Sequence, residues 1–467
     1  MSSNWEVSTT SHKGRYIRAK LPLTRGTLVL KSDPFAYTVT NKQKALRCSA
    51  CLKASEGLRG CGRCKKLYFC NSQCQRRAWP RHKQECKAIC ASQKVALDAM
   101  SIVCHAVWRA AADKKTLFDS DFGVLQSNRR LQSTDDDVAQ APTAMLIRTY
   151  LESSGIEASQ IPSIGDAMNA LSVIKTNSFT ILDDEMMECG VGIYPLASNF
   201  NHSCDPNVVI TFNGFELQAR LIRNVHTGDE MTISYIDNAK PREERRNQLR
   251  KQYYFNCDCS LCGDTQMDDT HLAFRCQQRV GGNQCDAMVP FDDGKQLVGD
   301  DALCSQGHVQ SITGDRMNST AQHLDDKITE AKSVSESDRA IQMCDEVMCT
   351  GRKILFKYNT QLTAISSATC DIAINHGRFD KAYDYGMDGT RGLYRILSDG
   401  FDPRLGIQCL RMAKLGAHIY TEPNEHLYRR KVEEFAKEAV KILTVTHGAS
   451  NRLISEARML VINQIPM

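Results

Sequence analysis

The sequence predicts an α+β protein: a β core of small antiparallel sheets that carries an inserted zinc finger and a helical insert, followed by a carboxy-terminal helical domain. Cysteine and histidine residues at metal-ligand spacing between residues 48 and 86 predict the finger. Alternating apolar positions in residues 1–46 and 207–236 predict the sheets, and helical periodicity in 91–172 and beyond 320 predicts the helices. With 467 residues and 42% hydrophobic content, the chain has room for two or three domains with sizeable cores.

Short strands are predicted at both ends of the β core. In residues 1–46, Gly26 marks a turn and Leu28-Val29-Leu30 forms a buried run. In residues 207–236, turns are expected at Asn213-Gly214 and at Thr227-Gly228-Asp229. This pattern is typical of small antiparallel sheets.

Seven cysteines and one histidine supply the ligands for two tetrahedral zinc ions. They are Cys48, Cys51, Cys61, Cys64, Cys70, Cys74, His82 and Cys86. The first four form two CxxC turns, while Cys70/Cys74 and His82/Cys86 have the i,i+4 spacing of one helix face. Eight ligands satisfy two closed sites and leave no open position for catalysis, so these ions are expected to build a fold. A disulfide framework would require an oxidising compartment, and the amino terminus shows no secretory leader.

A third zinc set is expected further along the chain. Cys257, Cys259 and Cys262 offer three thiolates at tight spacing, and Cys204, within Asn201-His202-Ser203-Cys204, is the natural fourth ligand. A zinc ion bound in this way brings Asn201, Tyr235 and Phe255 together although they are far apart in the sequence. Twelve metal ligands and three zinc ions are therefore predicted.

A fourth set is left open by the sequence. Cys304 and His308 have ligand spacing, whereas Cys276 and Cys285 are separated by a loose interval. The sequence alone favours unligated thiols at these positions over a fourth zinc.

Helices are predicted in two regions. Apolar residues recur at helical spacing through 91–172, around a polar stretch at 127–141. Beyond residue 320 the pattern is helical, with breaks at His376-Gly377, at Thr421–Asn424 and at His447-Gly448. These breaks leave helix pairs of the length found in tetratricopeptide-like arrays, which stack to bury their apolar faces.

Charge is distributed unevenly along the chain. Residues 42–87 contain thirteen Lys or Arg and only two acids, a balance of +11 that leaves −6 for the remainder of a chain whose net charge is +5. Such a basic segment is equally compatible with a solvated surface and with non-specific nucleic-acid contact, and no residue set indicates base reading. No apolar run is long enough to span a membrane, and 21 cysteines without a leader indicate a reducing compartment.

The finger residues resemble the MYND zinc finger, whose pattern continues through Phe69-Cys70, Gln73-Cys74, Trp79-Pro80 and His82-Lys83. That resemblance implies that Cys48, Cys51, Cys70 and Cys74 hold one zinc ion, and that Cys61, Cys64, His82 and Cys86 hold the other. It also implies that the finger binds proline-rich peptides.

The downstream motifs resemble the SET-domain lysine methyltransferases, and a MYND finger inserted in a SET domain indicates the SET- and MYND-domain (SMYD) family. The resemblance is carried by Lys13–Ala19, Asn177–Ile181, Asn201–Asn207, Gly228–Met231 and Ser234-Tyr235. It divides the chain into a SET amino-terminal part (1–46), a MYND finger (47–90), a helical SET insert (91–172), a SET core (173–240), a post-SET zinc segment (241–270) and a TPR-like helical domain (271–467).

Family resemblance together with chemistry assigns roles to individual residues. A substrate lysine, with an ordinary pKa of ~10.4, must arrive neutral so that its lone pair attacks the methyl group of S-adenosylmethionine. Tyr235 is expected to orient the amine, with Tyr253 and Phe179 as aromatic walls of a lysine channel. The cofactor-binding residues implied are Lys13, Gly14, Arg15, Asn201, His202, Tyr235, Tyr253 and Phe255.

The resulting prediction is a monomeric protein-lysine N-methyltransferase of nucleus and cytoplasm that acts on histone or non-histone lysines. The alternative is a non-catalytic chromatin or transcription adaptor that binds proline-rich partners through its finger. One departure favours the adaptor, because many family members have Gly where this chain has Tyr16.

Overall fold

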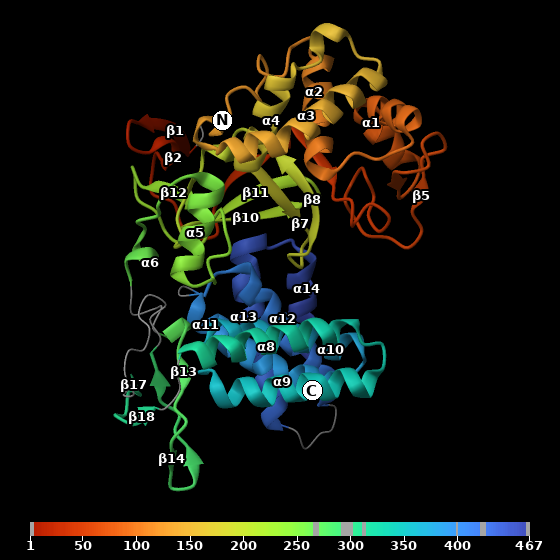
Figure 1. The fold of residues 1–467 in the computed structure, drawn as a ribbon. Helices are drawn as coiled ribbons and strands as arrows, with labels where there is room; N and C mark the ends of the chain where they lie inside the picture. Colours follow the sequence, from red (N-terminus) through yellow and green to blue (C-terminus); the bar gives the residue numbers. More distant parts are fainter. Residues whose placement is uncertain are drawn as a thin grey trace. The chain divides into compact units, whose positions relative to one another are not determined.

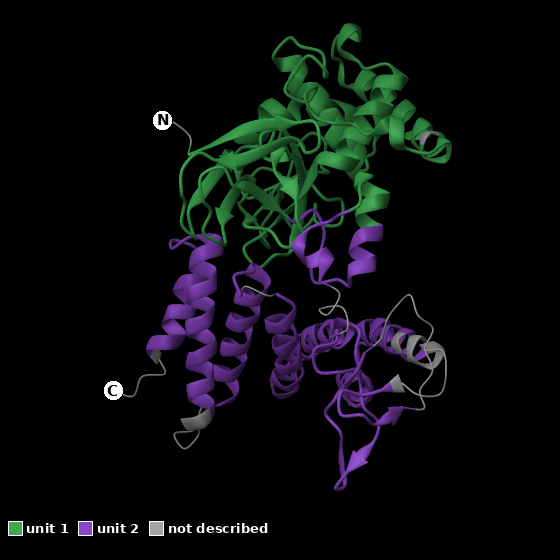
Figure 2. Cartoon of the chain, turned by 90° about the vertical axis from the view of Figure 1, so that its left-hand side faces the viewer, with its two compact units in different colours: residues 1–233, 248–256 green, residues 234–247, 257–467 purple. Residues whose placement is uncertain are grey.

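A computed structural model describes residues 4–264, 270–290, 302–310, 314–397, 400–420 and 426–463. These residues form two compact units, drawn in different colours in Figure 2. The first unit comprises residues 1–233 and 248–256, and the second comprises 234–247 and 257–467. The six-part division implied by the family resemblance therefore stays a prediction.

Three sheets of three or four strands form the β core of the first unit (Figure 1). One sheet has the order β1-β2-β12-β9, with strands Trp5–Thr10, Gly14–Ala19, Glu230–Ile233 and Asn201–His202. The second has the order β10-β11-β3, with strands Val208–Asn213, Glu216–Leu221 and Leu28–Ser32. The third has the order β4-β8-β7, with strands Ala36–Val39, Glu188–Ile193 and Ser178–Leu182. All pairs are antiparallel except β12 with β9.

The turns that were predicted from glycine are present. Gly214 has φ +63 and closes the hairpin in which Asn213 faces Glu216 across β10 and β11. Gly228 has φ +90 directly before β12. Because only glycine adopts positive φ without a steric cost, these residues fix where the strands reverse.

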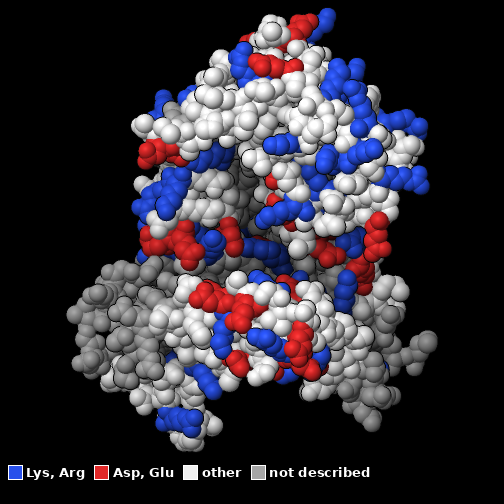
Figure 3. Space-filling model, turned by 45° about the vertical axis from the view of Figure 1, so that its right-hand side comes forward, with Lys and Arg blue, Asp and Glu red and all other residues white. Residues whose placement is uncertain are grey.

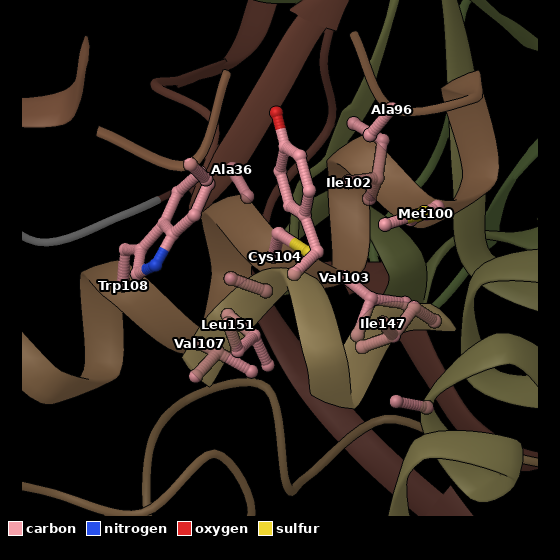
Figure 4. Packing of buried hydrophobic residues seen from close by; sticks show 14 of the residues in the cluster. Ala36, Ala96, Met100, Ile102, Val103, Cys104, Val107, Trp108, Ile147 and Leu151 are labelled. Carbon is pink, nitrogen blue, oxygen red and sulfur yellow. The ribbon is translucent and has the colours of Figure 1, made fainter. Parts of the chain in front are cut away.

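The finger and the helical insert share one core. The helices are α1 (Ser72–Ser92), α2 (Asp98–Ala112), α3 (Thr134–Ser154) and α4 (Ile164–Asn177), and the finger adds the hairpin β5 (Arg59–Gly60) and β6 (Tyr68–Phe69). Figure 4 shows Val107 and Trp108 of α2 near Leu151 of α3 in this core. Helix α3 begins inside the polar stretch at 127–141, where Ser133 and Asp136 form a capping box.

The second unit is mainly helical. Its helices are α6 (Ser260–Gly263), α8 (Gly314–Ser333), α9 (Ser337–Ile354), α10 (Thr360–Asn375), α11 (Phe379–Ile396), α12 (Pro403–Ile419), α13 (His426–His447) and α14 (Arg452–Asn463). The breaks at His376-Gly377 and His447-Gly448 are confirmed, whereas Thr421–Asn424 lies outside the described residues. Helix α5 (Arg242–Tyr253) divides its residues between the two units.

Neighbouring helices of the second unit approach closely at glycines. A Cβ atom on Gly392 of α11 would lie 1.9 Å from the Thr363 Oγ1 atom of α10. A Cβ atom on Gly406 of α12 would lie 2.9 Å from both Ile442 and Leu443 of α13. Side chains at these positions would push the helices apart, so the glycines allow the close pairing that a stacked helical array requires.

The start of the predicted helical domain is not helical. Among the described residues of this segment, 274–290 and 302–310, short strands form three two-stranded sheets, each strand two residues long: β13 (Phe274–Arg275) with β16 (Met288–Val289), β14 (Arg279–Val280) with β15 (Asn283–Gln284), and β17 (Ala302–Leu303) with β18 (Val309–Gln310). Strands this short leave no periodicity in the sequence, which explains why they were missed.

Candidate zinc centres and active site

The eight finger ligands form the two sets implied by the family resemblance. The donor atoms of Cys48, Cys51, Cys70 and Cys74 all lie within 4.8 Å of one another, as do those of Cys61, Cys64, His82 and Cys86. Tetrahedral coordination at a Zn–S distance of about 2.3 Å places neighbouring sulfur atoms about 3.8 Å apart. The Sγ atoms of Cys51 and Cys70 are 3.7 Å apart and those of Cys61 and Cys86 are 3.9 Å apart. Both sets therefore match the geometry of zinc.

The two CxxC pairs have the same backbone conformation. Leu52 and Lys65, each directly after the second cysteine, adopt positive φ of 64 and 56. Their amides donate to the carbonyls of Cys48 and Cys61 at 2.9 Å. These bonds turn the chain so that both sulfurs of a pair point to one centre, as predicted.

The helical assignment of Cys70 is wrong. Helix α1 begins at Ser72, because the Asn71 side chain accepts a hydrogen bond from the Cys74 amide and caps the helix. Cys70 follows β6 instead, so a strand end and a helix start supply this pair. His82 and Cys86 do lie on one face of α1.

A buried carboxylate orients the histidine ligand. The His82 Nε2 atom lies 3.6 Å from Cys64 Sγ, while its Nδ1 atom lies 3.1 Å from Glu85 Oε2. The other oxygen of Glu85 lies 3.3 Å from His105 Nε2, and both Glu85 and His105 are buried. Since the carboxylate accepts the Nδ1 proton, the lone pair on Nε2 is directed at the metal position.

Electrostatics of the donor atoms also fit a divalent cation. Burial and the sulfurs of Cys48 and Cys51 raise the pKa of Cys70 to about 12. Burial also raises the pKa of Cys61, but the amides of Cys64 and Arg63 together with His82 outweigh it and lower that pKa to about 6. The thiolates within a set thus repel one another, and a Zn²⁺ ion at the centre would offset this repulsion.

The third set is divided between the units. In the second unit the sulfurs of Cys257, Cys259 and Cys262 lie within 4.8 Å of one another. The buried guanidinium of Arg245 donates to the Leu261 carbonyl at 3.4 Å and lies 3.9 Å from Cys262 Sγ. Cys204 belongs to the first unit, where it is buried and its sulfur lies 3.2 Å from His202 Nε2. Its role as the fourth ligand stays a prediction.

One sheet assembles a polar cluster from three distant parts of the sequence. Asn201 on β9 donates its side-chain amide to the Lys13 carbonyl at 3.2 Å and to Glu230 Oε1 at 2.9 Å. Lys13 in the β1–β2 turn pairs with Glu230 Oε2 at 2.6 Å. The parallel pairing of β9 with β12 explains this meeting, because it places Asn201 opposite Thr232, two residues from Glu230. Lys13 and Asn201 were predicted site residues, whereas the role of Glu230 was missed.

The turn at residues 201–207 is held by further hydrogen bonds. Asn207 donates to the Glu230 carbonyl and accepts from the Thr232 amide, both at 2.8 Å. The Ser203 amide donates to the Ile233 carbonyl at 2.9 Å. These bonds fix the turn against β12 within the first unit.

Two predicted cofactor residues are brought together at the end of α5. The ring centroids of His202 and Phe255 lie 5.9 Å apart with a tilt of 56°. Tyr254 between α5 and Phe255 has φ +64, which ends the helix and turns the chain. Burial raises the pKa of Tyr253, the last residue of α5, to about 12, so its phenol stays protonated at neutral pH.

The remaining aromatic residues lie in separate elements. Phe179 on β7 packs edge-on against Tyr194 with ring centroids 5.6 Å apart. Strand β12 ends at Ile233, and Tyr235 lies two residues beyond it. Tyr235 belongs to the second unit. The lysine channel made from Phe179, Tyr253 and Tyr235 stays a prediction.

The departure at Tyr16 causes no backbone strain. Tyr16 lies in β2 opposite Ser8, and its φ is not positive. Gly14, by contrast, has φ +65 in the turn that contains Lys13. The glycine that this turn requires is therefore present, and Arg15 follows it in β2, opposite Thr9.

Comparisons with known proteins define the class. Residues 48–86 match the family model of the MYND finger. Human histone-lysine N-methyltransferase SMYD3 is 31% identical over 98% of this chain and 96% of its own length. Bovine N-lysine methyltransferase SMYD2 is 32% identical over 56% of this chain and 61% of its own length. The structure of the SET domain of LSMT bound to lysine and AdoHcy aligns with a TM-score of 0.35 and 13% identity, over 95% of this chain and 89% of that chain.

These relatives place the chain among the zinc-binding protein-lysine methyltransferases with a MYND finger, because one of them is 31% identical over nearly the whole chain. The chain belongs to the SET- and MYND-domain (SMYD) family of lysine methyltransferases.

Proposed function

We propose that the protein transfers methyl groups from S-adenosylmethionine to lysines of histone or non-histone proteins. One observation carries the proposal: the cluster of Lys13, Asn201 and Glu230, in which Asn201 donates to the carbonyl of a residue 188 positions away. The names of the relatives support a lysine substrate, and the name of human SMYD3 supports a histone.

The cluster suits the amino-acid portion of the cofactor. The ammonium of the cofactor needs a hydrogen-bond acceptor, and its carboxylate needs a donor nearby. In the cluster, Glu230 can accept, while the Lys13 ammonium and the Asn201 amide can donate. A Cβ atom on Gly14 would meet nothing within 4 Å, so the backbone beside the cluster is accessible. His202 and Phe255 offer two rings of the kind on which an adenine stacks.

When bound, the cofactor supplies a sulfonium methyl group as the electrophile. The protein residues must deliver a neutral amine in line with it, and aromatic walls such as Tyr253 and Phe179 favour this by removing water from the amine. The substrate ammonium gives up its proton to solvent water before transfer. A hydroxyl such as that of Tyr235 orients the nitrogen lone pair during transfer.

The test replaces Tyr235 with Phe, which keeps the ring and removes the hydroxyl. Single-turnover methylation of a peptide array, read by mass spectrometry, should fall ~100-fold or more. Calorimetric S-adenosylmethionine binding should change much less, because the Tyr235 ring and the other cofactor-binding residues are retained. A rate within a few-fold of wild type in a folded, zinc-loaded variant would remove Tyr235 from the mechanism. Failure of the wild-type chain to bind S-adenosylmethionine would overturn the proposed function itself.

A second function is supported by the surface of the finger. The MYND finger is a protein-interaction module, and we propose that it binds proline-rich peptides at Trp79 and the face of α1 from Gln73 to Arg77. Trp79 retains 38% exposure although it packs edge-on against His82, and Gln73 is exposed. Exposed aromatic rings are the usual platform for proline-rich segments.

The finger is also the basic part of the first unit. Lys42, Lys53, Arg59, Arg63, Lys65, Lys66, Arg76, Arg77 and Lys83 are exposed. Figure 3 shows Lys and Arg side chains gathered on the first unit, in the upper part of the view. We include non-specific nucleic-acid contact in the proposal on this basis, and the salt dependence of binding to duplex DNA tests it.

The proposal also covers oligomeric state and location. We propose a monomer that works in the nucleus and the cytoplasm; the location is supported by the lack of disulfide bonds among the cysteines that the structure describes. Among the same residues, no helix combines the length and apolar character that a membrane crossing requires. Sedimentation of the purified chain and fractionation of cells test these two points.

A further inference from the structure

A fourth group of metal-ligand side chains lies in the hairpin segment of the second unit. The donor atoms of Cys276, Cys285, Cys304 and His308 all lie within 4.8 Å of one another. The Cys276 Sγ and His308 Nδ1 atoms are 3.7 Å apart, close to the 3.6 Å between Cys64 Sγ and His82 Nε2 in the finger. The group thus has the composition and the spacing of the Cys₃His finger site.

Backbone amides surround the sulfur of Cys304 as they surround a finger ligand. The amides of Gln306 and His308 lie 3.4 Å from Cys304 Sγ. In the finger, the amide of Ala50 lies at the same distance from Cys48 Sγ, two residues before it. Amide hydrogens directed at sulfur stabilise a thiolate, which is the form that binds metal.

A buried amide side chain supports the sulfur of Cys276. Gln310 Nε2 lies 3.0 Å from Cys276 Sγ, and its Oε1 accepts from the Gln277 amide at 3.0 Å. Gln310 is only 4% exposed, so its orientation is fixed. Such a partner acts in the second coordination shell of a metal site.

The ligands stand at the ends of strands that are too short to be stable alone. Cys276 follows β13, Cys285 follows β15 and Cys304 follows β17, while His308 precedes β18. Figure 1 labels these small hairpins β13, β14, β17 and β18. Each ladder pairs only two residues per strand, and isolated hairpins of that size do not persist in water. Small elements of this kind are usually held by a metal or by disulfides.

We propose that Cys276, Cys285, Cys304 and His308 bind a fourth, structural zinc ion. Three thiolates and an imidazole are soft donors that select zinc among the common divalent ions. Four protein ligands close the coordination sphere, so the ion holds structure and does not activate water. A histidine within the group argues against a pair of disulfides.

The zinc ion would secure the carboxyl end of helix α9. Arg275 donates to the Arg352 carbonyl at 3.1 Å, while Gln277 and Gln284 donate to the Lys353 carbonyl at 3.0 and 2.8 Å. These carbonyls belong to the last turn of α9, where no helical partner is available. The ion would fix the short strands that carry Arg275, Gln277 and Gln284. These three side chains then stay in place to cap the carboxyl end of α9 and to join the segment to the helical array.

The test measures zinc per chain in the full-length protein by metal analysis and native mass spectrometry. His308→Ala should bind one zinc fewer than wild type, whereas His308→Cys, which retains a ligand, should bind the wild-type number. Cys349→Ser is the matched control, because Cys349 is an exposed cysteine of α9 outside every ligand group. This variant should also keep the wild-type number.

Hydrogen exchange locates the missing ion. The amides of residues 274–290 and 302–310 and those that follow α9 should exchange faster in His308→Ala, with the finger unchanged. An equal zinc content in wild type and His308→Ala would overturn the proposal. A loss in His308→Cys equal to that in His308→Ala would overturn it as well, since it would show a need for the imidazole in packing and not for a ligand.

Discussion

Replacing Glu85 with Gln should weaken zinc retention at the finger site that contains His82. The Glu85 carboxylate contacts His82 Nδ1 at 3.1 Å and His105 Nε2 at 3.3 Å, and it is only 3% exposed. The two histidines hold the pKa of Glu85 well below its usual range, although burial by itself would raise it. The carboxylate is therefore charged and directed at the ring of a metal ligand.

The magnitude follows from the role of such second-shell groups. Removing the partner of a ligating histidine typically weakens metal affinity about 10- to 100-fold, or about 1.4 to 2.8 kcal/mol. Gln preserves the volume and can still accept one hydrogen bond, so the finger should fold and the effect should lie within this range. Only one of the two finger ions should be affected, because Glu85 contacts a ligand of that set alone among the described residues.

The assay is competition with a chromogenic chelator. The Glu85→Gln variant should release one equivalent of zinc at a chelator concentration about 10- to 100-fold lower than wild type requires. Glu56→Gln is the control, because Glu56 is the other acid of the basic segment and is exposed. If both variants release zinc at the same chelator concentration, Glu85 does not orient the ligand and the reasoning is wrong.

Two further predictions concern cofactor and peptide binding. Asn201→Ala removes the amide that contacts Lys13 and Glu230. Calorimetry should therefore show S-adenosylmethionine binding weakened about 10-fold or more. Unchanged binding would exclude the cluster from the cofactor site. Gln73→Glu, on the exposed face of α1, should reduce capture of a proline-rich peptide and leave methylation of a short peptide unchanged. Equal losses of peptide capture and methylation would contradict separate roles for the finger and the active site.

The finger was predictable because its ligands are local. CxxC pairs and the His82/Cys86 pair place donors within one turn, so spacing alone gave the ligand list and the family pattern gave the pairing. Glu85 and His105 were missed because the second contact joins α1 to α2 through the core. The i,i+3 spacing of His82 and Glu85 was the available signal.

The active-site cluster was predictable only in part. Lys13 and Asn201 follow from motif positions, but Glu230 follows from the parallel pairing of β9 with β12, which no local pattern specifies. The closeness of Cys276, Cys285, Cys304 and His308 could not be predicted for a related reason. The eight residues between Cys276 and Cys285 form the hairpin β14–β15, whose tight turn at Gly281 and Gly282 reverses the chain and returns the second sulfur to the first.

Acidic pH should destabilise the second unit through His271. This side chain is 1% exposed, and neither ring nitrogen has a hydrogen-bond partner among the described residues. Burial and the positive charges of Arg245 and Arg395 lower its pKa to about 4, despite the opposing charge of Asp264. The unfolded chain binds this proton near pH ~6.5, whereas the folded chain binds it only near pH 4. The free energy of unfolding therefore has its full value above pH ~6.5 and falls as the pH drops toward 4.

From the two pKa values, the free energy of unfolding should fall by about 2 kcal/mol between about pH 7 and pH 5. His271→Leu removes the titrating group and an unsatisfied polar side chain at similar volume, so the variant should match or exceed wild-type stability at about pH 7. Urea unfolding of both proteins should show their difference growing by about 2 kcal/mol at about pH 5. Because acid also displaces zinc from both proteins, that common effect cancels in the difference. A pH-independent difference would mean that His271 is protonated in the folded protein, and that the two arginines do not exclude the proton.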